Sequence, residues 1–165
     1  MESVIPPDPK PIPAFSFIAF SGTGKTTLLE KLIVELKSRG LRVAIIKHDA
    51  HDFEIDKEGK DSWRFTHAGA DVSVIASSSK AAIMENRPIE LEVIRSRISD
   101  VDIILTEGYK QGDWPKIAIH RSASGNPMPL PENECFAIVS DVPFVTDVPC
   151  FDLDDVSGLA DLLIG

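Results

Sequence analysis

The sequence predicts an α/β fold in which a mainly parallel central sheet is flanked by layers of helices. Short apolar segments of strand composition alternate along the chain with segments whose apolar residues recur at helical spacing. Residues 43–46 form an uninterrupted apolar run, which is typical of a parallel strand covered on both faces. Ligands of such sheets bind beyond the carboxyl ends of the strands. Those ends are therefore where functional side chains are expected.

Length and composition predict one domain, placed at residues 14–165. Residues 1–13 contain five prolines, which favours an extended lead-in. The net charge of −9 argues against a nucleic-acid partner, because DNA and RNA favour clustered Lys and Arg. No segment has the length of a membrane span, and the first residues lack a signal-peptide pattern. The two cysteines make no disulfide framework, so we expect a cytoplasmic protein.

Residues 15–27 have the order strand, small-residue turn, Gly-Lys-Thr and helix, which is the context of a P-loop. Backbone N–H groups of such a turn, with the open amides of the helix, bind phosphate. Lys25 adds a charge for the outer phosphates, and the Thr26 hydroxyl is placed to ligate magnesium. The expected phosphate-binding residues are Ser21, Gly22, Thr23, Gly24, Lys25, Thr26 and Thr27.

One position departs from this motif, because Ala19 stands where the pattern has its first glycine. Alanine resists positive φ, so the first turn of the loop is expected to be slightly altered.

The helix after the loop has one apolar face and is expected to end at Gly40. A strand at residues 43–46 leads into a long acidic loop at 48–60, followed by a short helix at 62–68. Residues 72–76 and 80–85 predict two strands that pair with each other, because only three residues separate them. Apolar residues between 89 and 98 predict another helix.

In the remaining chain, residues 101–106 and 136–139 predict two further strands. Residues 116–120 alternate weakly and predict an edge strand. Asp152 is the expected N-cap of a closing helix with an acidic first turn. The expected buried face of that helix comprises Val156, Leu159, Ala160 and Leu163.

Glu107 is the candidate carboxylate for the magnesium ion. Asp102 begins the same predicted strand, about 16 Å away at roughly 3.3 Å per residue. Only Glu107 thus lies at the ligand edge, where it would hold magnesium directly or through water and take part in catalysis. Gly108 would let the backbone approach a γ-phosphate. A strand ending in an exposed glutamate is the alternative.

The loop after residue 46 follows the same topological rule and gathers Lys47, His48, Asp49, His51 and Asp52 near the phosphates. The two histidines alone are too few ligands to favour a zinc site. Asp49 or Asp52 could orient water or magnesium in a loop that responds to the γ-phosphate, and Asp52 is the catalytic candidate. A merely solvated loop remains the alternative.

Asp141 ends the last strong strand, where its carboxylate could accept from two donors of guanine and so favour GTP. The sequence has no plain Asn-Lys-x-Asp motif. A turn before Pro143 is the alternative reading of Ser140 and Asp141.

Several longer segments together resemble the molybdopterin-guanine dinucleotide biosynthesis protein B family (MobB), over residues 15–163. The most specific is Lys-His-Asp-Ala-His-Asp-Phe-Glu-Ile-Asp-Lys-Glu-Gly-Lys-Asp-Ser-Trp-Arg at 47–64, followed by His-Ala-Gly-Ala at 67–70. Residues 101–110, 115–117 and 137–141 carry further signatures. Asp49-Ala50 departs from the family's usual Thr-His, as Ala19 does from its glycine.

The resemblance implies a GTP-binding protein of the P-loop NTPase superfamily with weak GTPase activity and magnesium as cofactor. It also implies assistance to MobA, the nucleotidyltransferase that joins GMP to molybdopterin, and makes molybdopterin itself a further candidate ligand. A homodimer is the family's default.

An enzyme proper is the alternative to this adapter role. An ATP-dependent small-molecule kinase or a carboxylate-activating ligase could use the same P-loop scaffold. Such an enzyme needs an acceptor pocket, which Lys110, Lys116 and Arg121 could line. The sequence contains no separate constellation for that role.

Overall fold

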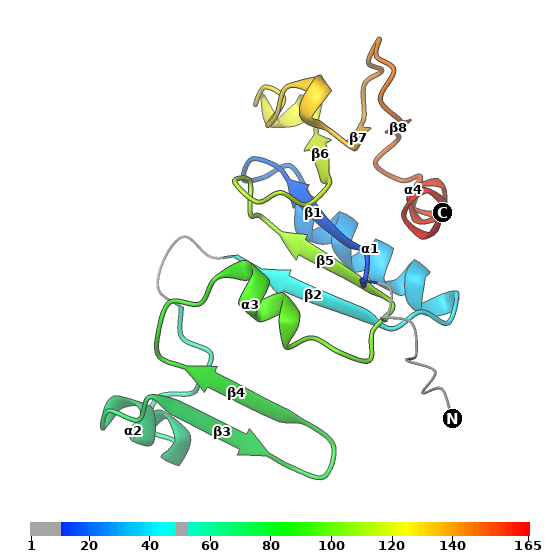
Figure 1. Ribbon diagram of the computed structural model, residues 1–165. Coiled ribbons are helices and arrows are strands. Elements are labelled where there is room, and N and C mark those ends of the chain that lie inside the picture. Colours follow the sequence, from blue (N-terminus) through cyan, green and yellow to red (C-terminus); the bar gives the residue numbers. More distant parts are fainter. Residues whose placement is uncertain (1–10, 49–52) are drawn as a thin grey trace, which may run out of the picture. The chain divides into compact units, whose positions relative to one another are not determined.

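The computed structural model describes residues 11–48 and 53–165 (Figure 1). They divide into two compact units. The first, called the sheet unit, comprises the chain up to residue 48 together with residues 98–165. The second, called the hairpin unit, comprises residues 49–97. The lead-in at 1–13 and a single domain at 14–165 stay predictions. Within the described ranges, no helix combines the length and apolar character needed to cross a membrane.

The sheet unit is built on six parallel strands in the order β2-β5-β1-β6-β7-β8 (Figure 1). The strands are β1 (Ala14–Ile18), β2 (Val43–Lys47), β5 (Ile103–Glu107), β6 (Lys116–His120), β7 (Ala137–Ser140) and β8 (Cys150–Phe151). Helices α1 (Lys25–Ser38) and α4 (Val156–Ile164) pack against each other. The predicted α/β fold with a mainly parallel sheet is confirmed.

One core joins these helices to the sheet. Alternate strand residues, among them Phe17, Leu105 and Ile119, are fully buried together with Leu32 on α1 and Leu159 on α4. Successive strand side chains point to opposite faces, so this alternation directs one residue in two toward the helices. Each fully buried side chain of this kind contributes about 1.5–3 kcal/mol. The core therefore fixes α1, and with it the loop that precedes α1.

The end of α1 is as predicted. Gly40 has φ 82°, and its amide donates to the Lys37 carbonyl over 3.0 Å, while the Leu41 amide donates to the Leu36 carbonyl over 3.1 Å. This is the glycine-terminated helix end in which a left-handed residue lets the chain turn back on the last carbonyls.

Three sequence predictions need correction. Residues 116–120 are not an edge strand: β6 lies between β1 and β7, and its central residues Ile117, Ala118 and Ile119 are fully buried. Lys116 and His120 at its ends produced the misleading alternation. The strand β2 is one of the two edge strands, the other being β8, and its Ile45 is 48% exposed, so the predicted cover on both faces is wrong.

The N-cap of α4 is Asp155, not Asp152. The Asp155 carboxylate accepts from the Gly158 amide over 3.0 Å, whereas Asp152 accepts from the Asp154 amide in the turn before the helix. Neighbouring acidic residues offered equivalent caps in the sequence, and the position of the first helical residue decides between them. The predicted buried face is confirmed for Leu159, Ala160 and Leu163.

The hairpin unit contains α2 (Asp61–His67), β3 (Val72–Ala76), β4 (Ala81–Glu85) and α3 (Leu91–Ser96). The strands β3 and β4 pair with each other in antiparallel register as a separate two-stranded sheet, which confirms the predicted pairing. Neither helix has a buried residue, and Val74 and Ile83, which lie opposite each other, are 61% and 68% exposed. A two-stranded sheet with so little core is marginally stable by itself.

Candidate functional site

The loop between β1 and α1 has the backbone of an anion site. Gly22 and Gly24 adopt left-handed φ values of 79° and 88°, and α1 begins at Lys25 without a side-chain cap. The buried Thr23 hydroxyl donates to the Phe20 carbonyl over 2.7 Å and closes the turn. The first amides of a helix lack partners within that helix and carry its positive dipole end. Together these features fit a bound phosphate.

Ala19 is accommodated without strain. Outside glycine, Asp100 and Tyr109 are the positions of positive φ in the described chain, so Ala19 keeps an ordinary backbone conformation. Its side chain packs against the core of the sheet unit. The first glycine of the motif is therefore not needed for the backbone path that this loop takes.

Lys25 and Glu107 meet at the carboxyl edge of the sheet. The Lys25 Nζ atom lies 3.7 Å from Glu107 Oε1, and the two side chains are 20% and 19% exposed. The strand β5 pairs with β1, with Glu107 opposite Phe17, so the last residue of β5 stands beside the start of the loop. Glu107 thus lies at the carboxyl edge of the sheet, and its role toward a ligand stays a prediction.

Asp102, which directly precedes β5 at the end opposite Glu107, has a different environment. Its carboxylate accepts from the Arg42 amide over 2.7 Å and from the Arg42 guanidinium over 2.9 Å. These bonds lower the pKa of Asp102 to about 2. Asp102 is therefore a structural partner that joins β2 to β5.

The turn after Glu107 depends on glycine. Gly108 has φ 101°, its amide donates to the Phe17 carbonyl over 3.1 Å, and a Cβ there would lie 3.3 Å from His48 Cβ. The His48 ring contacts Tyr109 with ring centroids 4.6 Å apart. His48 is thereby placed at the carboxyl edge, as predicted.

Asp141 lies at the end of β7, but its carboxylate is engaged by the protein. Oδ1 accepts from the Ser122 amide over 2.8 Å, and Oδ2 accepts from the Ser122 hydroxyl over 2.7 Å. These two hydrogen bonds lower the pKa of Asp141.

Arg121 is a loop contact that the sequence did not reveal. Its Nε donates to the Thr23 carbonyl over 3.0 Å, and its guanidinium lies 3.2 Å from where a Cβ on Gly24 would stand. The available signal was its position, since Arg121 directly follows β6 at the same edge of the sheet.

Among the remaining candidates, Lys47 ends β2 opposite Glu107 in the strand register. Asp49, His51 and Asp52 lie outside the described residues, so their proposed roles stay predictions. No group of three or more His, Cys, Asp or Glu side chains suited to a metal occurs among the residues that the structure describes.

Comparisons with known proteins decide the family. Residues 14–141 match the family model for molybdopterin guanine dinucleotide synthesis protein B, MobB. The chain belongs to the MobB family. It is 43% identical over 161 residues to the molybdopterin-guanine dinucleotide biosynthesis adapter protein of Escherichia coli (strain K12), covering 93% of this chain and 92% of that protein. The protein of the same description from Haemophilus influenzae is 38% identical over 156 residues, with coverages of 92% and 88%.

Solved structures agree on the fold. The crystal structure of Bacillus subtilis MobB has a TM-score of 0.72 at 24% identity and covers 93% of this chain and 99% of its own. A crystal structure of molybdopterin-guanine biosynthesis protein B has a TM-score of 0.67 at 27% identity, with coverages of 92% and 97%. The family resemblance inferred from the sequence is therefore confirmed.

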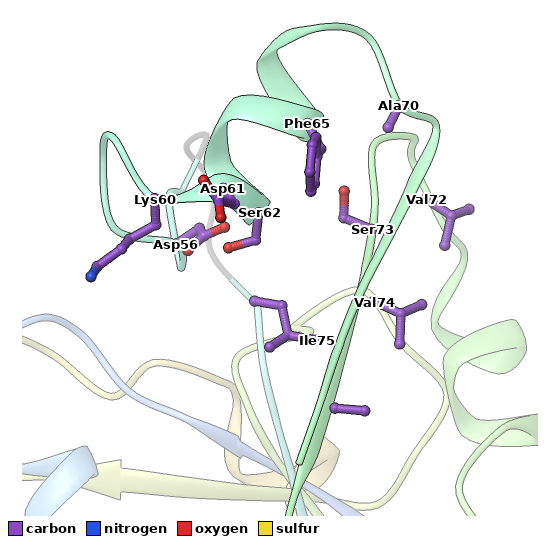
Figure 2. Close-up of a pocket in the computed structure, with 11 residues that line it drawn as sticks. Asp56, Lys60, Asp61, Ser62, Phe65, Ala70, Val72, Ser73, Val74 and Ile75 are labelled. Carbon is purple, nitrogen blue, oxygen red and sulfur yellow. The ribbon is translucent and has the colours of Figure 1, made fainter.

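The hairpin unit of this MobB-family chain has a hollow of its own, about 630 Å³ in volume, between α2 and β3 (Figure 2). Asp56, Asp61 and Ser62 gather near the start of α2, while Phe65 and Ile75 supply apolar walls. The Thr66 and Ser73 hydroxyls, 2.9 Å apart, tie α2 to β3. The hollow is open and combines polar and apolar walls.

Proposed function

We propose that this MobB-family chain binds GTP with magnesium and acts as an adapter in the biosynthesis of molybdopterin guanine dinucleotide. The observation that carries the nucleotide site is the meeting of a glycine loop, the start of α1 and the Lys25–Glu107 pair at one edge of a parallel sheet. The description of the relatives as adapter proteins supports the pathway role.

Magnesium and a nucleoside triphosphate fit the residues present. Amides from Ser21 to Thr27 would receive the phosphates, and Lys25 would neutralise their outer oxygens. Magnesium prefers oxygen ligands, which the Thr26 hydroxyl and the Glu107 carboxylate provide. When bound, magnesium would offset phosphate charge. The Glu107 carboxylate would then face both the metal and the Lys25 ammonium, which lies 3.7 Å away.

The proposed hydrolysis of GTP is weak, and binding to MobA, the nucleotidyltransferase, is the main role. Asp52 or Asp49 is proposed to orient water or magnesium beside the γ-phosphate. Lys47, His48 and His51 are further candidates in the same loop. Molybdopterin is a further proposed ligand. Binding of MobA to the GTP-loaded chain but not to the nucleotide-free chain, in a sedimentation assay, is the expected result.

A homodimer is part of the proposal. The two-stranded sheet of β3 and β4 exposes apolar side chains: Val72 is 51%, Val74 61% and Ile83 68% exposed. This exposed apolar surface supports a second copy of the chain as its partner. Val74→Lys should shift the sedimentation coefficient to that of a monomer, whereas Val34→Lys, at an exposed site on α1, should not. The two free cysteines support a reducing, cytoplasmic location.

Calorimetric titration with GTP and ATP, each with and without magnesium, tests the nucleotide site. Lys25→Ala should weaken GTP binding about tenfold to a hundredfold, because it removes a charged partner of the phosphates. Lys31→Ala is the matched control, since Lys31 lies on the same helix and pairs with Asp154 over 2.8 Å. Preference for ATP over GTP would instead favour the kinase or ligase alternative.

A further inference from the structure

One short segment, residues 121–126, donates hydrogen bonds to carbonyl groups of the phosphate loop and is here called the buttress segment. Arg121 Nε donates to the Thr23 carbonyl over 3.0 Å, and Asn126 Nδ2 reaches the Ser21 carbonyl over 3.5 Å. Within the segment, the Ser124 hydroxyl donates to the Arg121 carbonyl over 2.7 Å and accepts from the Asn126 amide over 3.2 Å. The two donors to the loop are thus linked to each other.

These contacts fix the direction of particular loop amides. In a trans peptide the carbonyl and the following N–H point in opposite directions, and no peptide bond of the described chain is cis. Holding the Ser21 and Thr23 carbonyls on one side therefore turns the Gly22 and Gly24 N–H groups to the other. Because both glycines can rotate freely through positive φ, their peptides need such an external hold to stay oriented.

Asp141 holds the buttress segment in turn. It accepts from both the amide and the hydroxyl of Ser122, the residue next to Arg121, over 2.8 and 2.7 Å. The paired oxygens that would grip two donors of a guanine base are thereby used within the protein. A continuous path runs from the end of β7 through Ser122 and Arg121 to the loop.

We propose that Asp141 is a positioning residue that orients the phosphate-binding amides through Ser122 and Arg121, and does not read the base. Asp141 then affects how tightly the loop binds the phosphates, whichever base the nucleotide carries. This inference rests on the proposed phosphate-binding function of the loop, and it assigns the buttress segment a role in affinity and not in the choice between GTP and ATP.

The test is the affinity of Asp141→Asn for GTP, ATP and inorganic pyrophosphate, each with magnesium. We expect all three to weaken by the same factor, about tenfold for the loss of a charge-assisted bond. Asp147→Asn, which removes the same charge from an exposed site on the following loop, should bind as the wild type does. Weakening of GTP alone, with ATP and pyrophosphate unchanged, would overturn the proposal in favour of direct base reading.

Two further variants keep the test decisive. Ser122→Ala removes only the hydroxyl bond to Asp141, so it serves as the milder variant if Asp141→Asn does not fold. It should lower the affinities for all three ligands by a common factor that is smaller than in Asp141→Asn. Arg121→Met keeps an unbranched side chain but removes every donor to the Thr23 carbonyl, so unchanged binding by this variant contradicts the proposal. A wild type that binds none of the ligands contradicts the proposed function instead.

An amide readout separates positioning from general destabilisation. In nitrogen–proton correlation spectra without ligand, Asp141→Asn should shift the Gly22 and Gly24 signals, while leaving Gly40, which ends α1, in place. Unmoved Gly22 and Gly24 signals would contradict a role in orienting their peptides.

Discussion

The ammonium of Lys25, the first residue of α1, lies 3.7 Å from the carboxylate of Glu107, the last residue of β5. Lys25 and Glu107 are 82 positions apart in the sequence, and the parallel pairing of β1 with β5 brings them together. Their charges are opposite and their side chains are mostly buried, so each group limits the freedom of the other. Phosphate would compete for Lys25, and magnesium would compete for Glu107.

Glu107→Gln should therefore reduce the magnesium dependence of GTP binding. The amide keeps the size of the side chain but loses the charge that a hard cation requires. The gain in GTP affinity that magnesium produces should be about tenfold smaller in the variant than in the wild type, as expected for the loss of a charged partner. Titrations with GTP at several magnesium concentrations measure this.

Asp102→Asn is the control for that experiment, because Asp102 directly precedes the same strand, at the end opposite Glu107. It should leave the magnesium response as in the wild type. An equal loss in both variants would show that the effect comes from disturbance of β5 and not from the metal.

Acid should weaken the fold partly through Asp102. Its pKa is about 2 in the folded chain, below the ordinary value of 3.8, because hydrogen bonds from Arg42 stabilise the charged form. A depressed pKa contributes stability above the unfolded value that is lost as pH falls through the folded one. The wild type should lose stability relative to Asp102→Asn between about pH 4 and pH 2. Urea unfolding across that range checks this, and parallel curves for the two proteins would contradict it.

The cap of α4 gives a test in the other helix of the core. Asp155→Ala should lower the free energy of unfolding by about 1 kcal/mol, because the Gly158 amide loses its acceptor. Asp152→Ala removes an acceptor outside the helix and should cost less. A larger loss of unfolding free energy in Asp152→Ala than in Asp155→Ala, measured by urea unfolding, would instead support Asp152 as the cap.

How much the sequence could predict depended on whether the signal was local. The loop glycines, Lys25 and the stop at Gly40 follow from residues a few positions apart, and the structure has them as expected. The place of β6 inside the sheet is set by long-range pairing with β1 and β7, so the polar ends of that strand led to the wrong prediction of an edge strand. The strand β8 was missed because it is two residues long.

The candidate site divides in the same way. Glu107 followed from a topological rule that places strand ends together. The contacts of Asp141 and Arg121 depend on how the segment after β6 folds back onto the loop, through bonds between residues 98 and 19 positions apart. Neither residue type nor spacing specifies such contacts, so a base-reading role was the natural prediction for Asp141 from sequence.

The turn at Gly108 supplies the final prediction. Gly108→Ala should lower the free energy of unfolding by about 1–2 kcal/mol for the left-handed backbone alone, with an added cost because the new Cβ would lie 3.3 Å from His48 Cβ. Gly40→Ala is the matched control: Gly40 has a similar positive φ, but a Cβ there meets nothing within 4 Å. Gly108→Ala should therefore be the less stable of the two in urea unfolding, and it should also weaken GTP binding, because Glu107 immediately precedes the strained residue. Equal stabilities would show that His48 moves aside freely, and unchanged GTP affinity would show that this turn does not set the position of Glu107.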